Sequence, residues 1–194
     1  MPHITTSPNH RFPWYVRLFF WNQRRRYGAV LEPARLWGRS PKVFICVALL
    51  FRALDRRSSP LEPALRSLVT VRVSQLNWCA FCVDINSSLV LKRGGNLDKL
   101  AELERFESSG LFSEREKAAL AYAEAATVTG RQTTPDIFAR LREHFDDDAI
   151  IELTALVAFQ NLSSKFNAAL GVEAQGFCMA APQPRRHDQG KASP

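Results

Sequence analysis

Apolar residues recur at helical spacing along most of the chain, and the alternating runs that form strands hardly appear. No Asn-Gly or Asp-Gly turn joins two such runs. The pattern therefore predicts an all-α fold. Helices are expected within residues 40–57, 59–76, 79–95, 113–130, 134–145 and 146–171.

Capping signals support these boundaries. Ser113 with Glu116 three residues later forms a capping box, and Thr134 precedes a proline at the first helical position. Three aspartates begin the last helix at Asp146, where they suit the positive end of the helix dipole. Glycines at 94, 95, 130 and 171 mark helix ends.

The length of 194 residues and the 46% hydrophobic content suit one globular core with flanking segments. We divide the chain into an N-terminal basic and aromatic extension (1–59), a core domain (60–178) and a disordered tail (179–194). The opening residues do not resemble a signal peptide, and the longest apolar run, Val43 to Phe51, has nine residues. A spanning helix needs about 20. A cytoplasmic location is expected.

Positive charge gathers at the N-terminus, because residues 1–66 hold 12 Lys or Arg and only 3 Asp or Glu. In "RFPWYVRLFFWNQRRRYG" the basic residues are interleaved with aromatic ones. We interpret this segment as a helix whose apolar stripe packs on the core or on a neighbouring subunit. Contact with a membrane surface is the weaker alternative, and a nucleic-acid partner is not expected.

The stretch "NWCAFCVDINSS" holds two of the four cysteines, Cys79 and Cys82, three residues apart. A structural zinc site would need four ligands, but Cys46 lies in an apolar run, Cys178 stands alone and no two histidines have metal spacing. Within its apolar run, Cys46 is expected to be buried and inert toward hydroperoxide. A chance pair of buried cysteines remains an alternative. A redox pair is favoured, with no metal and no cofactor.

The position of the pair supports this interpretation. Cys79 and Cys82 are expected in or beside the first turn of a helix, where unpaired N–H groups stabilise thiolates. Residues three apart share one helix face, so the two sulfurs can approach bonding distance.

These residues carry a resemblance. The run "LRSLVTVRVSQLNWCAFCVDINSS", with "ALAYAEAATVTG" and "FDDDAIIELTALVAFQNLSSKFNAALGVEAQGFC", resembles the alkylhydroperoxidase D-like (AhpD-like), or carboxymuconolactone decarboxylase, family over about residues 60–178. The resemblance implies an all-helical oligomer of three or six subunits. In the peroxidase branch it implies that Cys82 attacks the hydroperoxide and Cys79 resolves the sulfenic acid.

The resemblance also shows what is missing. Peroxidase members carry a Glu twelve residues before the first cysteine and a His four after the second, and here these positions are Ser67 and Asn86. Asn86 can donate a hydrogen bond to a thiolate and Ser67 can order a water, but neither accepts a proton near neutral pH. We assign both as supporting residues.

Other carboxylates were considered as the base. Asp84, two residues after Cys82, should face elsewhere on the helix. Glu62 and Glu152 are candidates that the fold would have to bring close.

The sequence thus predicts a weak thiol peroxidase or disulfide reductase that acts on a hydroperoxide with a thiol or dithiol reductant. Two alternatives remain open. One is a non-catalytic helical oligomer that serves as an interaction scaffold. The other is a decarboxylase or isomerase of a small organic acid.

Overall fold

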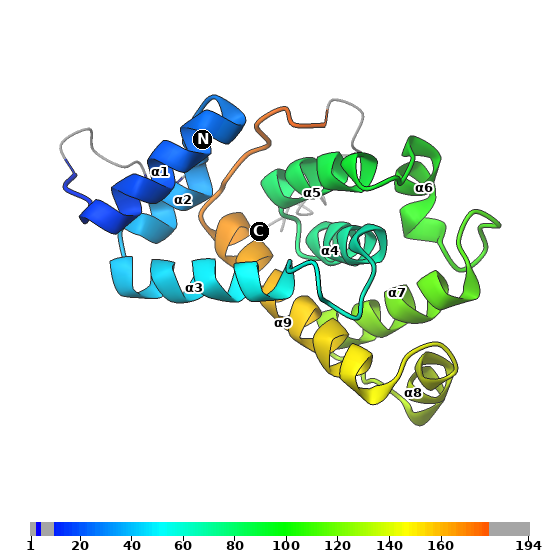
Figure 1. Ribbon diagram of the computed structural model, residues 1–194. Coiled ribbons are helices and arrows are strands. Elements are labelled where there is room, and N and C mark those ends of the chain that lie inside the picture. Colours follow the sequence, from blue (N-terminus) through cyan, green and yellow to red (C-terminus); the bar gives the residue numbers. More distant parts are fainter. Residues whose placement is uncertain (1–2, 5–9, 179–194) are drawn as a thin grey trace, which may run out of the picture.

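The computed structural model describes residues 3–4 and 10–178, and these are helical with no strand among them. The elements are α1 (Trp14–Tyr27), α2 (Glu32–Gly38), α3 (Pro41–Leu54), α4 (Pro63–Leu76), α5 (Ala80–Lys92), α6 (Leu97–Glu102), the 3-10 turn η1 (Leu103–Arg105), α7 (Glu114–Thr127), α8 (Pro135–Arg142) and α9 (Asp147–Ala169) (Figure 1). The predicted all-α class is confirmed. The tail predicted to be disordered lies outside the described residues.

Three predicted caps form as expected. Ser113 and Glu116 close both hydrogen bonds of the capping box at the start of α7. Thr134 accepts from the backbone N–H of Ile137 at α8. At α9, the Asp146 side chain accepts from the backbone N–H of Ala149, so the helix itself begins at Asp147, the second of the three aspartates. These local contacts explain why the C-terminal helices could be read directly from the sequence.

The main core surrounds α4. This helix packs against α5, with which it forms an antiparallel pair, and against α7 and α9 (Figure 1). Leu68, Val69, Leu120 and Leu153 are at most 1% exposed in this core. Because burial of each such side chain contributes about 1.5–3 kcal/mol, α4 and α5 are held rigidly. The turn between them is therefore a firm platform for the cysteine pair.

The N-terminal helices form a second layer beside this core (Figure 1). Val16 of α1, Trp37 of α2 and Phe44 of α3 are buried together. The indole of Trp37 stacks on Phe166 of α9, with ring centroids 3.5 Å apart. This contact attaches the N-terminal layer to the last helix of the chain.

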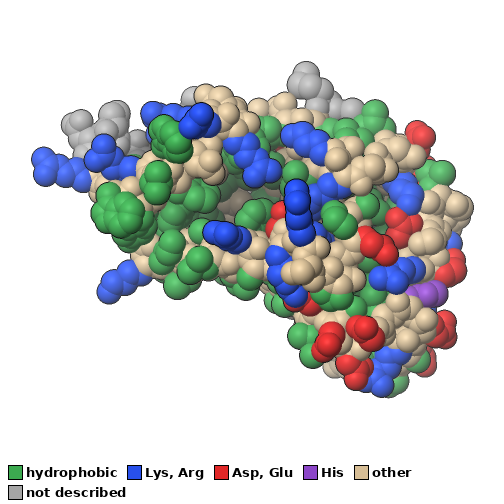
Figure 2. All heavy atoms as spheres, in the orientation of Figure 1, with side chains coloured by type: hydrophobic (Ala, Val, Ile, Leu, Met, Phe, Trp, Pro, Cys, Tyr) green, Lys and Arg blue, Asp and Glu red, His purple; other side chains and the backbone are tan. Residues whose placement is uncertain are grey.

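The outer side of this layer is apolar and exposed. Figure 2 shows hydrophobic side chains gathered over α1 and α3, whereas acidic ones lie toward the opposite end. The largest contributors are Trp14, Leu18 and Trp21 of α1 with Leu49 of α3, each more than half exposed. An apolar surface of this size is typical of a contact with another molecule.

Cys46 lies on this exposed side, which corrects the expectation that an apolar run would bury it. Helix α3 is apolar all round, but the buried residues Phe44 and Leu54 define its inward face. Cys46 is on the outward face, with Val43 and Leu50. Among the described residues, no helix has both the length and the apolar character needed to cross a bilayer.

Candidate active site

The turn from α4 into α5 sets the position of the cysteine pair. Helix α4 ends in a Schellman motif, in which Cys79 N–H donates to Ser74 O at 3.1 Å and Trp78 N–H donates to Gln75 O at 3.1 Å. Trp78 takes the left-handed conformation, φ 57°, where glycine is usual. A side chain there costs about 1–2 kcal/mol, so surrounding contacts must hold this backbone in place.

Cys79 and Cys82 form a disulfide at the start of α5, with Cα atoms 5.2 Å apart. Cys79 is the N-cap residue, and its Sγ accepts from the Cys82 N–H at 3.2 Å. Both side chains are buried, Cys79 being 0% and Cys82 2% exposed. The predicted placement at a helix start is confirmed, and the first-turn N–H groups can stabilise a thiolate once the bond is reduced.

A cavity of about 270 Å³ reaches one of the two sulfurs. Helices α1, α2 and α3 wall one side, and α5 and α9 wall the other; Figure 2 shows the surface hollowed between these parts. Cys82 belongs to the wall, whereas Cys79 does not. The lining is mainly aromatic and aliphatic, and includes Phe19, Leu31, Trp37, Phe44, Phe51, Phe81, Ile85 and Phe159. A small organic molecule can therefore reach Cys82 from this side.

Amide side chains supply much of the polar part of the wall, together with the Arg26 guanidinium and the Tyr27 hydroxyl. The Asn167 Nδ2 group donates to the Cys82 Sγ at 3.3 Å. Asn86, which was predicted to donate to this sulfur, instead donates to Ser74 Oγ at 3.5 Å, and Gln160 donates to the same oxygen at 2.9 Å. The hydrogen-bond donor at Cys82 thus comes from α9 and not from the helix that carries the cysteine.

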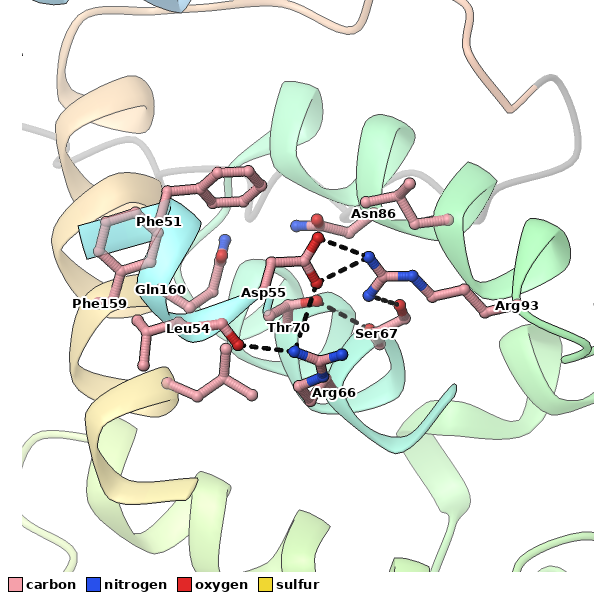
Figure 3. Close-up of a pocket in the computed structure, with 12 residues that line it drawn as sticks. Phe51, Leu54, Asp55, Arg66, Ser67, Thr70, Asn86, Arg93, Phe159 and Gln160 are labelled. Atoms are coloured by element: carbon pink, nitrogen blue, oxygen red, sulfur yellow. Dashed lines mark hydrogen bonds and ion pairs between the residues drawn. The ribbon is translucent and has the colours of Figure 1, made fainter. Parts of the chain in front are cut away.

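A second cavity of about 30 Å³, lined by apolar side chains together with a few charged and polar ones, lies beside Asn86 and has room for about one or two water molecules (Figure 3). Asn86 and Gln160 line both cavities. Asp55 points between Asn86 and Arg93, and its two carboxylate oxygens accept from Arg93 Nη2 at 2.7 and 2.8 Å (Figure 3). A carboxylate therefore does enter this region, from the end of α3.

Arg66 completes the charged cluster. Its Nη1 donates to Leu54 O at 2.7 Å and lies 3.6 Å from Asp55 Oδ1. Burial lowers the pKa of the Arg66 guanidinium below its usual value, and the charge of Asp55 acts in the opposite direction. With Arg93, the cluster holds two guanidinium groups against one carboxylate, so the small cavity is net positive.

Ser67 is part of this cluster and lines the small cavity, so its predicted part in ordering a water stays a prediction. Its hydroxyl donates to Pro63 O at 3.1 Å and accepts from Arg93 Nη1 at 3.1 Å. The side chain is buried, 2% exposed. The position that the resemblance reserves for a glutamate is therefore occupied by a serine bound to an arginine.

The carboxylates that were considered as bases lie elsewhere. Glu62 is 3.7 Å from Arg115, and Glu152 is 2.7 Å from Arg56; neither lines either cavity. Asp84 is buried and faces away from the large cavity, as expected from its place on the helix.

Asp84 fixes the segment that follows α9. Its carboxylate accepts from the backbone N–H of Gln175 at 2.8 Å and of Cys178 at 2.7 Å. Phe177 of the same segment packs edge-on against Phe81 of α5. In Figure 1 this segment runs back between the N-terminal helices and α5. Phe177 also packs against Tyr27, so the segment contacts two residues that line the cavity.

Asn167, Asp55 and Arg93 were not predicted from the sequence. Asn167 is 85 residues from Cys82, and Asp55 is 38 residues from Arg93. No local pattern in the sequence marked Asn167 or the ion pair.

A protein-family model matches part of this chain, and a known bacterial protein matches most of it. Residues 46–125 match the model of the carboxymuconolactone decarboxylase family. The uncharacterized protein YnjA of Escherichia coli (strain K12) is 46% identical over 171 residues, which cover 88% of this chain and 94% of that protein.

Two solved structures have the same fold. One is the alkylhydroperoxidase AhpD core, an uncharacterized peroxidase-related protein from Ralstonia eutropha JMP134, with a TM-score of 0.81 and 19% identity over 95% of this chain and 98% of that one. The other is the apo debrominase Bmp8, with a TM-score of 0.74 and 21% identity over 84% and 88%. At these identities the likeness shows the architecture.

Proposed function

The chain belongs to the carboxymuconolactone decarboxylase family, and on this basis we propose that it is a thiol-dependent hydroperoxide reductase of the alkylhydroperoxidase-like kind. The observation that carries the proposal is the asymmetry of the pair: Cys82 lines an apolar cavity, while Cys79 is bonded to it from outside that cavity. One sulfur is placed to meet a substrate and the other to close a disulfide.

The steps of the reaction balance without a further reactant. The Cys82 thiolate attacks the distal oxygen of the hydroperoxide, so that an S–O bond forms, the O–O bond breaks and the alkoxide leaves and takes a proton from solvent. The Cys79 thiol loses its proton and its thiolate attacks the sulfenic sulfur, so that the S–S bond forms, the S–O bond breaks and hydroxide leaves and takes up that proton to become water. A thiol or dithiol reductant restores the pair by exchange.

The cavity favours this chemistry over a proton-transfer reaction. Its lining is mostly apolar and contains neither a carboxylate nor a histidine. A decarboxylase or isomerase would need a proton donor or acceptor near the substrate, whereas thiolate attack needs only the sulfur and a stabilising donor. The lining also favours organic hydroperoxides, since their apolar groups would be buried there.

Peroxide treatment of the reduced protein tests the proposal. We expect one equivalent of cumene hydroperoxide to convert Cys79 and Cys82 into an intramolecular disulfide, as mapped by mass spectrometry after alkylation. Cys46 lies outside the cavity lining, so it should stay a free thiol and, alkylated after denaturation, serves as the internal reference. If Cys79 and Cys82 also stay alkylatable after peroxide, the redox function fails and the scaffold alternative gains support.

We also propose that the protein assembles with copies of itself through the apolar surface of α1 and α3. Light scattering at micromolar concentration should give a multiple of 21.9 kDa. Placing a charge in this surface by Leu49→Lys should lower the mass, because an unpaired ammonium would be buried. Asp136→Lys, at the exposed start of α8, is the matched control and should leave the mass unchanged. A wild-type mass near 21.9 kDa would contradict the assembly.

A further inference from the structure

We propose that Asn167 positions the hydroperoxide against Cys82: its Nδ2 group donates to the sulfur, and its Oδ1 accepts the hydroperoxide O–H. This inference rests on the proposed function of the pair. It assigns to an amide on α9 part of the work that the absent histidine would otherwise do.

The contacts of Asn167 carry the inference. The residue is 1% exposed, lines the large cavity and lies 3.3 Å from the Cys82 sulfur through Nδ2. Its Oδ1 is buried and has no hydrogen-bond partner among the described residues. Since a buried acceptor without a partner is costly and rare, an unpaired oxygen on a side chain that lines a cavity points to a ligand that donates to it once a small rotation of the amide exposes the oxygen.

The orientation of the amide follows from the charge on the sulfur. A thiolate can only accept hydrogen bonds, so the NH₂ group must face Cys82, and the oxygen is then turned away from it. The backbone fixes the residue as well, because Asn167 O accepts from Val172 N–H at 3.0 Å in the Schellman motif that ends α9. Val172 in turn packs in the same apolar cluster as both cysteines.

The neighbouring amides are already engaged. Asn86 and Gln160 both donate to Ser74, and neither contacts the sulfur. Asn167 is therefore the described side chain that offers the sulfur a donor and the cavity an open acceptor at the same time.

The two contacts suit the first step of the reaction. In a hydroperoxide the distal oxygen carries the hydrogen, so a bond from that O–H to Oδ1 holds the distal oxygen beside the thiolate. As the S–O bond forms and the O–O bond breaks, this hydrogen stays on the oxygen that becomes the sulfenic hydroxyl. Asn167 neither gains nor loses a proton, and the alkoxide takes its proton from solvent.

The test compares two reactions of Cys82, one with cumene hydroperoxide and one with iodoacetamide, in the wild type and in Asn167→Leu. Loss of the donor should move the half-maximal pH of Cys82 alkylation upward and should slow both reactions at pH 7 by about 10- to 100-fold. Loss of the acceptor should slow the hydroperoxide reaction by about a further 3- to 10-fold, even at a pH where the Cys82 thiolate is fully formed.

Asn167→Asp tests the donor contact alone, and it is close enough in size to asparagine to fold even if Asn167→Leu does not. It keeps an acceptor but places a negative charge beside the sulfur, so its alkylation midpoint should rise above that of the wild type. Lys165→Leu, on the solvent side of α9, should change neither reaction. Alkylation of Cys46 gives the reference within each sample.

The outcomes are distinguishable. If wild-type Cys82 is not oxidised by hydroperoxide at all, the proposed function fails. If it is oxidised and Asn167→Leu leaves both rates and the alkylation midpoint unchanged, the role of Asn167 is overturned. An equal loss in both reactions, with no additional loss toward the hydroperoxide, overturns the acceptor contact.

Discussion

Cys82→Ser is expected to abolish hydroperoxide consumption, a loss of about 10³-fold or more, because a serine hydroxyl in place of the thiolate is a far weaker nucleophile. Cys79→Ser should behave differently. Its Cys82 remains in the cavity wall, so one equivalent of hydroperoxide should be consumed in a burst that leaves a sulfenic acid on Cys82. Dithiothreitol-dependent peroxide consumption and dimedone trapping, read by mass spectrometry, measure the two results.

Cys46→Ser is the matched control and should keep full activity, since this cysteine lies on the exposed face of α3 and outside the cavity lining. A reversed pattern, with the burst kept in Cys82→Ser and lost in Cys79→Ser, would contradict the assignment of roles.

Asn86→His is expected to raise the rate at pH 7 by about 10- to 100-fold, toward the low end of what a general base contributes. Residue 86 is one turn beyond Cys82 and lines both cavities. An imidazole there could take the thiol proton and could be oriented by Asp55, which points toward this position (Figure 3). The wild type has neither a carboxylate nor a histidine in the lining, so its rate should follow the thiolate fraction of Cys82 and rise with pH until that thiolate is fully formed.

The structure changes how the missing relay should be rebuilt. Adding Ser67→Glu to Asn86→His would place a carboxylate where Arg93 now donates to Ser67 Oγ at 3.1 Å. The new glutamate would pair with Arg93, so it should add little to the single variant. Asn86→Leu serves as the control of similar size without a base. A wild-type hydroperoxide rate that stays constant over a pH range in which the alkylation rate of Cys82 still rises would mean that another group accepts the proton.

The parts of the fold that depend on neighbouring residues could be predicted from the sequence. The capping box at Ser113, the cap at Thr134 and the glycines after α5 each act within one helical turn, and each appears where expected. The glycine pair at 94–95 again forms a Schellman motif, in which a Cβ on Gly95 would lie 2.4 Å from a Val90 methyl group.

Within the site, too, the sequence predicted only the part that depends on neighbouring residues. The placement of Cys79 and Cys82 follows from a local motif, whereas Asn167 and Asp55 arrive through packing between distant helices. Cys46 shows the converse limit. The apolar run predicts that α3 is buried on at least one side. Other helices of the chain cover the side that holds Phe44 and Leu54, and the run alone does not tell that Cys46 lies on the exposed side.

The composition of the cavity wall has a consequence for how such proteins diversify. The sulfurs lie on α5, within residues 46–125 that match the family model, whereas α1 and α2, which close the opposite wall, precede that range. Reactive group and binding surface are thus encoded in separate stretches of the gene. Under the proposed function, mutations in the first forty codons can retune which compound is accepted while the electron-transferring motif is inherited unchanged.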